Sequence, residues 1–146
     1  MARDSPHERK IEPGESDTKG LIMSTSQNVE TSKKGYAAFA AGDVETVLNT
    51  WDDNIEWVVP GNSTMSGTYR GKAEVMGLLA KVAEKSFTTA PSRFLADGDV
   101  VVVLTQVTAG GESAPQADVW TFRDGKIVKG QTLGDTAMQE RIWGTK

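Results

Sequence analysis

Residues 92–133 read SRFLADGDVVVVLTQVTAGGESAPQADVWTFRDGKIVKGQTL, and this stretch decides the fold. Apolar and β-branched runs alternate in it with short turn signals, and Asp97-Gly98 and Asp124-Gly125 are typical of two-residue hairpin turns. The pair Gly110-Gly111 begins a looser turn. Consecutive strands that are joined by hairpins form an antiparallel meander. The predicted strands occupy about 86–96, 99–109, 115–124 and 126–134.

Helical patterns precede this meander. Ser24 and Gln27 fit a capping box, from which a first helix runs to Gly42. Asp43 is suited to cap a second helix, and Gly71 opens a third. The apolar residues that mark the three helical faces are Val29, Tyr36, Phe39 and Ala40, then Val44, Val47, Leu48 and Trp51, then Val75, Leu78, Leu79 and Val82.

Two strands separate the second helix from the third. Asn54–Val59 alternates with the period of a strand, and Pro60-Gly61 ends it. A short strand follows at about Met65–Arg70. After the meander, Asp135 begins a final helix whose inward residues are Met138 and Ile142.

This order of elements predicts the fold class. Because the helices come first, they must cover one face of the later sheet, and a long sheet twists and curls. We therefore predict an α+β fold, with a cone-shaped, curved antiparallel sheet packed on three N-terminal-side helices around an apolar pocket. Residues 23–146 form this domain. Residues 1–22 are rich in charged and small polar residues and are predicted to form a disordered tail.

Composition excludes several classes of function. The 146 residues carry a net charge of −4 and contain no cysteine, which argues against nucleic-acid binding, disulfides and thiolate metal sites. No apolar run has the length of a membrane span, so the expected location is the cytoplasm. The single histidine, His7, lies in the predicted tail. Ser-His-Asp catalysis and a histidine-ligated metal are therefore not expected, and neither is a cofactor.

Four short motifs stand in order along the folded part. They are YAAFAAGD at 36–43, EWVVPG at 56–61, GTYRG at 67–71 and DVWTFRDGKI at 118–127. Together they resemble the SnoaL-like branch of the nuclear-transport-factor-2-like superfamily, which includes the ketosteroid isomerases. The resemblance covers about residues 26–143 and implies a cone with a deep pocket and a homodimer through the outer face of the sheet. It leaves the reaction open, because this fold hosts many functions.

Asp118 is the candidate catalytic residue. In the strand 115–124 it shares one face with Trp120 and Phe122, and desolvation between two inward aromatic side chains raises the pKa of a carboxyl group. Such a group serves as an acid, a base or a hydrogen-bond donor near neutral pH. The resemblance implies the same role, because Asp118 matches the pocket Asp with which the isomerases stabilise an oxyanion. A structural Asp that caps a turn or forms a salt bridge is the alternative.

The other two catalytic positions of the isomerases differ in this chain. Their general base precedes the strand-ending proline, where this chain has Val59. Their oxyanion Tyr aligns with Gly35, and Tyr36 is displaced from it by one residue, or about 100° of helix rotation. SnoaL-like relatives often carry a His where this chain has Val58. Steroid isomerisation is therefore not expected.

The remaining pocket walls are expected to be apolar. The candidate ligand-binding residues are Tyr36, Trp57, Val59, Met65, Tyr69, Trp120 and Phe122, with Val103 as a further wall residue. For each of them, plain core packing is the alternative, and a buried Tyr commonly bonds to backbone. Arg70 is expected in a structural salt bridge. The strand pattern leaves open whether Gln131 faces the pocket or a dimer interface.

Three functions are consistent with these residues. The leading hypothesis is an isomerase, cyclase or hydrolase that acts on a small apolar carbonyl or epoxide compound, with Asp118 supplying a proton or an oxyanion contact. The second is a non-catalytic dimeric binder or carrier of small apolar ligands. The third is an interaction module that uses the outer face of the sheet and fills its pocket with its own side chains.

Overall fold

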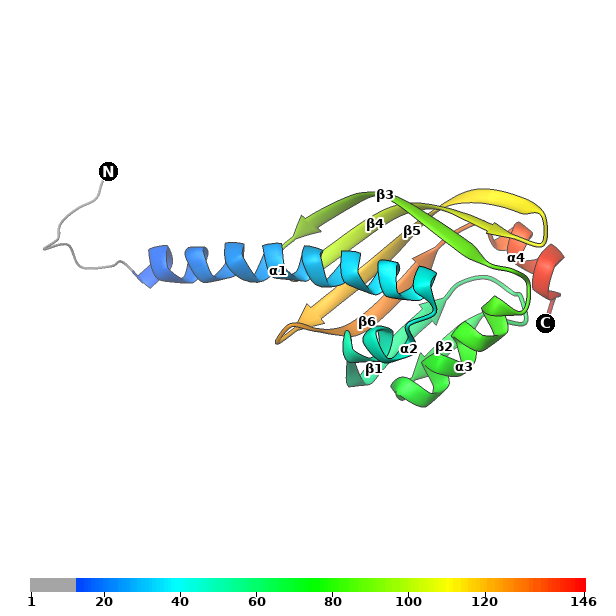
Figure 1. Cartoon of the computed structure of the whole chain (residues 1–146), viewed down its shortest axis with the longest axis horizontal. Coiled ribbons are helices and arrows are strands. Elements are labelled where there is room, and N and C mark those ends of the chain that lie inside the picture. The colour runs from blue at the N-terminus through cyan, green and yellow to red at the C-terminus, as the bar shows by residue number, and fades with distance from the viewer. Residues whose placement is uncertain (1–12) are drawn as a thin grey trace, which may run out of the picture.

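The computed structural model describes residues 13–146, which form a curved six-stranded sheet with helices across one face (Figure 1). The strands follow the order β2-β1-β6-β5-β4-β3. Their bounds are β1 Trp51–Val59, β2 Gly67–Arg70, β3 Thr88–Asp97, β4 Val100–Ala109, β5 Glu112–Arg123 and β6 Lys126–Leu133. The helices are α1 Pro13–Ala41, α2 Val44–Asn49, α3 Gly71–Ala83 and α4 Thr136–Trp143. None of the helices described in this range is long and apolar enough to cross a membrane.

The predicted meander is confirmed. Strands β3, β4, β5 and β6 pair consecutively and antiparallel. Between β5 and β6, Asp124 has φ 52° and Gly125 has φ 78°, so both residues of the turn are left-handed. A tight hairpin turn of this kind matches the twist of its strands, which explains why the Asp-Gly signal located it correctly.

One strand pair departs from the predicted antiparallel sheet. β1 lies beside β6 and runs parallel to it, with Trp57 opposite Gly130. The chain leaves β1 through β2 and α3 and completes most of the meander before β6 returns to its side. A connection of that length allows a parallel pair, whereas a short hairpin does not.

The first helix begins earlier than predicted. α1 starts at Pro13, within the segment 1–22 that the sequence assigned to a disordered tail, and it passes through Ser24 without a break. The capping box at Ser24 is therefore not a helix start. Pro is favourable in the first turn of a helix, and extending an existing helix costs less free energy than nucleating one. Residues 1–12, including His7, lie outside the described residues.

The caps of the shorter helices are as predicted, but α2 is shorter. Asp43 accepts a hydrogen bond from the backbone N–H of Thr46, and Asp135 accepts one from that of Met138. α2 ends at Asn49, so Trp51 is the first residue of β1 and not part of the helix. Trp51 is nevertheless a core residue, with 4% of its surface exposed.

The core consists of three apolar clusters. The largest joins α1, α2 and α3 to the middle of the sheet and includes Ile55, Val75 and Val103. The second lies between β1, α3 and the loop that carries Met65, and the third lies beneath α4 around Met138. All three clusters contribute side chains to the walls of one pocket.

Candidate functional site

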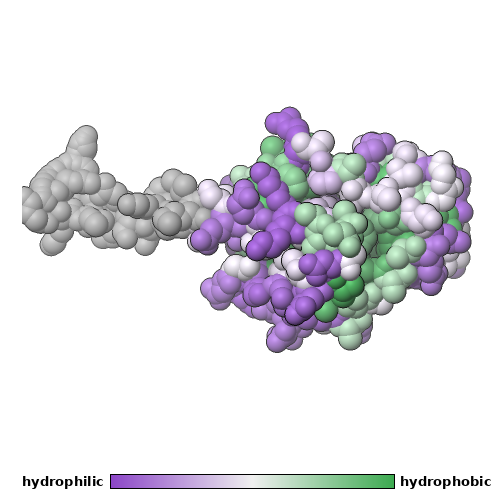
Figure 2. Space-filling model, in the orientation of Figure 1, coloured by the Kyte–Doolittle hydropathy of each residue, from purple (hydrophilic) through white to green (hydrophobic). Residues whose placement is uncertain are grey.

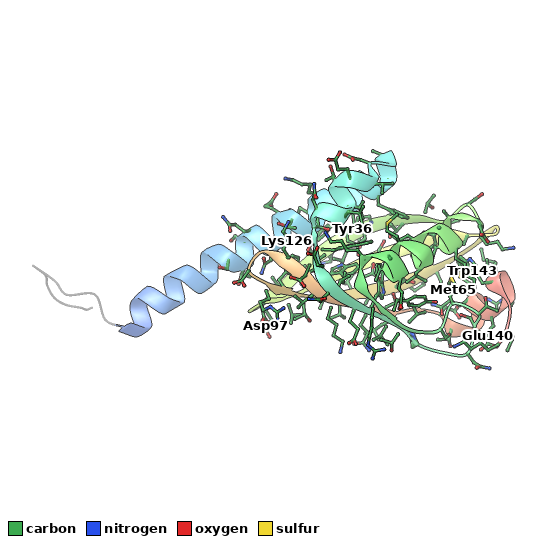
Figure 3. All side chains as sticks on the ribbon, turned by 90° about the horizontal axis from the view of Figure 1, so that it is seen from below. Tyr36, Met65, Asp97, Lys126, Glu140 and Trp143 are labelled. Atoms are coloured by element: carbon green, nitrogen blue, oxygen red, sulfur yellow. The ribbon has the colours of Figure 1, made fainter. Side chains whose placement is uncertain are left out.

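A pocket of about 140 Å³ lies between the helices and the inner face of the sheet. Figure 2 shows apolar residues gathered over the middle of the helix-bearing face and bordered by hydrophilic ones. In Figure 3, Tyr36 lies toward the α1 side, whereas Met65 and Trp143 lie together nearer α4. All three residues line the pocket, which therefore extends from the C-terminal half of α1 to α4.

Asp118 is the buried acid of this pocket. It lies on the inner face of β5 with Trp120 and Phe122, as the strand alternation predicted, and only 5% of its surface is exposed. The hydroxyl of Tyr36 donates a hydrogen bond to Asp118 Oδ2. Gln116 Nε2 donates one to Asp118 Oδ1 at 2.9 Å. Each carboxyl oxygen thus accepts one hydrogen bond from the protein.

Tyr36 is brought to the site by α1. Trp120 Nε1 donates a hydrogen bond to the Tyr36 hydroxyl oxygen at 3.1 Å, and the Tyr36 ring packs edge-on against Phe94. The one-residue displacement of Tyr36 therefore does not keep its hydroxyl away from Asp118. α1 packs so that both Gly35 and Tyr36 border the pocket, and the length of a tyrosine side chain carries its hydroxyl to β5.

The pair has unusual acid–base properties. Burial raises the pKa of Asp118, and the hydrogen bonds from Tyr36 and Gln116 act in the opposite direction. The pKa of Tyr36 is raised well above its usual value, first by burial and then by the negative charge of Asp118. Tyr36 is therefore a neutral hydrogen-bond donor rather than a phenolate base.

The protonation state of Asp118 decides whether the pair can donate a proton to a ligand. The Tyr36 proton is engaged with Asp118, and the Gln116 proton in contact with Asp118 is engaged as well. In the ionised state the Asp118 carboxylate carries no proton to donate. In the protonated state, which burial favours, its own acid proton becomes available to an acceptor atom.

The predicted wall residues divide into two groups. Those that line the pocket are Tyr36, Trp57, Val59, Met65 and Trp120. Tyr69 donates its hydroxyl to the backbone oxygen of Met65 at 2.6 Å, and Phe122 and Val103 are packed in the largest core cluster. These last three residues are not among those that line the pocket.

Several polar wall residues were not predicted. Gln116 stands two positions before Asp118 on the same strand face, so strand alternation alone could have indicated it. Thr132 lies opposite Asp118 in the β5–β6 pairing and accepts a hydrogen bond from Trp57 Nε1 at 3.0 Å. Gln139 and Trp143 reach the pocket from α4. The positions of Thr132 and of the α4 residues depend on register and docking, which a single sequence does not reveal.

Other predicted features are structural. Arg70 forms a salt bridge with Glu56 at 3.1 Å, as expected. Gln131 lies opposite Val119, and because its neighbour Thr132 lines the pocket, Gln131 faces the outer side of the sheet. Within residues 13–146, no three His, Asp or Glu side chains come together as a metal-binding group.

Comparisons with known proteins match nearly the whole folded part. A family model described as a SnoaL-like domain matches residues 33–130. The solved structure of Bal32a, from a soil-derived mobile gene cassette, has a TM-score of 0.77 and 26% identity over 82% of this chain and 98% of its own. The structure of TerC co-crystallised with polyporic acid has a TM-score of 0.71 and 29% identity over 82% of this chain and 99% of its own. An uncharacterized protein of Mycobacterium tuberculosis is 25% identical over 83% of this chain and 99% of its own length.

Proposed function

The chain belongs to the SnoaL-like family of the nuclear-transport-factor-2-like superfamily, and from that premise we propose that it is an enzyme acting on a small, largely apolar carbonyl or epoxide compound. The reaction is an isomerisation, cyclisation or hydrolysis. Asp118 donates a proton, or a hydrogen bond, to the oxygen atom of the substrate. The reaction requires no cofactor.

The observation that carries this proposal is the hydrogen-bond network around Asp118. Burial favours the neutral acid, which is the form that can donate to a substrate oxygen. The hydrogen bonds from Tyr36 and Gln116 favour the carboxylate that remains after the proton has left. The two effects oppose each other, and a proton-transfer group whose two states are nearly balanced is what general acid catalysis needs.

Proton transfer from Asp118 activates a carbonyl or an epoxide substrate. As the Asp118 proton approaches a carbonyl oxygen, the C=O electron pair shifts toward that oxygen and the carbon becomes electrophilic. In an epoxide, the same proton neutralises the oxygen as a C–O bond breaks and the oxygen of water, or a nucleophilic group of the substrate, forms a new bond to that carbon. Asp118 becomes a carboxylate in either case, and it recovers its proton from water or from the intermediate. The apolar walls strengthen these electrostatic interactions by excluding solvent.

The ligand of a structural relative supports the proposed substrate class. TerC was crystallised with polyporic acid, a diphenyl-substituted dihydroxyquinone in which each carbonyl has a phenyl ring on one side and a hydroxyl group on the other. That combination suits a pocket whose buried acid, Asp118, lies among largely apolar walls. Polyporic acid is therefore a suitable first probe for this chain.

The test compares binding of polyporic acid by the wild type and by Asp118→Leu, which removes the donor at similar volume, followed through the fluorescence of the tryptophans that line the pocket. We expect the variant to bind about two- to tenfold more weakly, because leucine has no proton to donate and a net hydrogen bond between neutral groups is worth about 0.5–1.5 kcal/mol. The control is Asp53→Asn, at a carboxylate whose side chain is 92% exposed. Equal binding by all three proteins would refute a role for Asp118.

A second function is favoured by the β1 side of the pocket. There the chain supplies Trp57 and Val59, and neither side chain can accept a proton as a base would. A non-catalytic carrier of small apolar ligands would have such walls. For such a carrier, apolar compounds would raise the melting temperature of the wild type and of Asp118→Ala by the same amount. The enzyme hypothesis does not predict equal stabilisation of the two proteins.

We further infer that the protein forms a homodimer through the outer face of the sheet. An apolar row crosses that face in register, since Leu95 pairs with Val102, Val102 with Val119, and Gln131 with both Val119 and Val58. A second outer row contains Leu104 and Leu133, and Leu133 is 48% exposed. A contiguous apolar surface of this kind marks an interaction site.

A further inference from the structure

Gln139 is a buried polar residue that the proposed chemistry does not use. It lies in the first half of α4, with 6% of its surface exposed, and it borders the pocket. Its backbone N–H donates to the Asp135 carbonyl within the helix. Its side-chain oxygen, Oε1, is buried and has no hydrogen-bond partner among the residues that the structure describes.

The neighbouring wall groups do not supply the missing hydrogen-bond donor. Trp143 Nε1 donates to the Lys81 carbonyl at 3.3 Å, and Gln116 Nε2 donates to Asp118. The Met138 N–H donates to Asp135, and the side chains of Met138 and Phe87, which belong to the α4 cluster, carry no donor. A carbonyl oxygen that has lost its water without gaining a partner is costly, and native proteins keep few such groups without a functional reason.

We propose that Gln139 is a specificity-determining residue, whose Oε1 accepts a hydrogen bond from a hydroxyl or N–H group of the ligand. The inference rests on the proposed function, because it places that ligand in the same pocket with an acceptor oxygen at Asp118. The ligand then has polar groups at two places on an apolar body, an oxygen that accepts a proton from Asp118 and a donor that faces α4. Hydroxylated aryl ketones and phenolic quinones belong to this class, whereas purely hydrocarbon ligands do not.

The free protein gives a first test, which requires no ligand. Gln139→Met keeps the length of the side chain and removes the unpartnered oxygen, so the ligand-free variant should melt a few degrees above the wild type. Gln27→Met, at an exposed position of α1, is the matched control and should not show this gain. A lower melting temperature for Gln139→Met would show that the oxygen already has a structural partner, and it would overturn the inference.

The second test measures dissociation constants for three probes: para-hydroxybenzophenone, para-methoxybenzophenone and benzophenone. All three offer a carbonyl oxygen to Asp118, but only the first offers a hydroxyl proton. We expect the wild type to prefer the hydroxyl compound over its methyl ether by about three- to tenfold, and Gln139→Met to bind the two equally. Asp118→Leu, which has no proton to donate, should weaken all three by a similar factor.

These outcomes separate the inference from the proposed function. A hydroxyl preference that persists in Gln139→Met, or that is absent from the wild type, overturns the role of Gln139 and leaves that of Asp118 standing. A preference that depends on Gln139, with equal binding by the wild type and Asp118→Leu, supports Gln139 and overturns the role of Asp118. If the wild type binds none of the ketones, both are overturned.

Discussion

The hydroxyl of Tyr36, on α1, donates a hydrogen bond to the carboxyl group of Asp118, on β5, across 82 residues of sequence. The bond fixes α1 to the inner face of the sheet and also couples the two groups electrostatically. Burial raises the pKa of Asp118 and this hydrogen bond acts against it, whereas burial and then the charge of Asp118 both raise the pKa of Tyr36. Removing either group must therefore change the proton affinity of the other.

Tyr36→Phe should raise the pKa of Asp118 further, because the variant loses a hydrogen bond that favours the carboxylate. If protonated Asp118 is the active form, the loss of ligand binding at high pH should move to a higher pH in the variant. NMR titration of labelled aspartate carboxyl groups would measure the change directly. Tyr69→Phe is the control, since that hydroxyl bonds to the Met65 carbonyl. A downward shift in Tyr36→Phe would contradict the network described above.

Asp118 should also make stability depend on pH. Burial raises its pKa in the folded protein, so below about pH 4 the group is protonated in both the folded and the unfolded states. Above that pH the unfolded chain releases the proton first, and the free energy of unfolding falls as pH rises until the folded pKa is passed. The slope from this single group is at most about 1.4 kcal/mol per pH unit.

Asp118→Asn should lack that part of the pH dependence. From about pH 4 upward, the free energy of unfolding of the variant should rise progressively relative to that of the wild type. Urea unfolding at several pH values would measure this difference. Asp53→Asn, at an exposed carboxylate, should follow the wild type. Curves for Asp118→Asn and wild type that stay parallel at all pH values would show that the pKa of Asp118 is not raised.

Much of the fold could be predicted because its signals are local. The Asp124-Gly125 turn, the helix cap at Asp135 and the inner face of α3 are all determined by residues that are close in sequence. The position of Asp118 on the inner face of its strand was predictable for the same reason, since alternation places every second residue of a strand on one side.

The features that the sequence did not reveal depend on tertiary structure. The parallel pairing of β1 with β6 joins strands from opposite ends of the domain. The contact between Tyr36 and Asp118 depends on how α1 sits on the sheet, which helix register alone does not determine. The unpartnered oxygen of Gln139 becomes apparent only when α4 has been docked and its neighbours' donors have been assigned.

Gly130→Ala should damage the site through Trp120. A Cβ atom at Gly130 would lie 2.5 Å from Trp120 Cζ3 and 3.4 Å from Trp57 Cδ2, so the indole that donates to Tyr36 must move. We expect a loss of stability of about 1–3 kcal/mol and weaker ligand binding. Gly77→Ala is the control, because a Cβ there meets nothing within 4 Å and α3 should gain about 0.5–1 kcal/mol. Thermal melting and ligand titration of both variants would measure these effects.

Val119→Lys should give a monomer. Val119 lies in the middle of the outer apolar row and is only partly buried in the single chain. A lysine there would place two like charges in a symmetric interface while leaving the folded monomer intact. Light scattering would measure the mass, and Ala73→Lys, at an exposed position of α3, serves as the control. A wild type that is monomeric at all concentrations would refute the proposed dimer.

Val59→Asp should add the base that the site lacks. Val59 is 5% exposed and lines the same pocket as Asp118, so a carboxylate at this position would face a ligand that Asp118 polarises. With bound tetralone, a ketone that carries exchangeable hydrogens beside its carbonyl, the variant should exchange them for deuterium about a hundredfold faster than the wild type, as followed by NMR. Burying the new carboxyl group should lower stability by about 1–3 kcal/mol. Val59→Asn introduces a polar side chain that cannot act as a base, so this variant should exchange the hydrogens no faster than the wild type. If Val59→Asn and Val59→Asp exchange at the same rate, Asp118 does not act as an acid opposite β1, and the binding-only function is favoured.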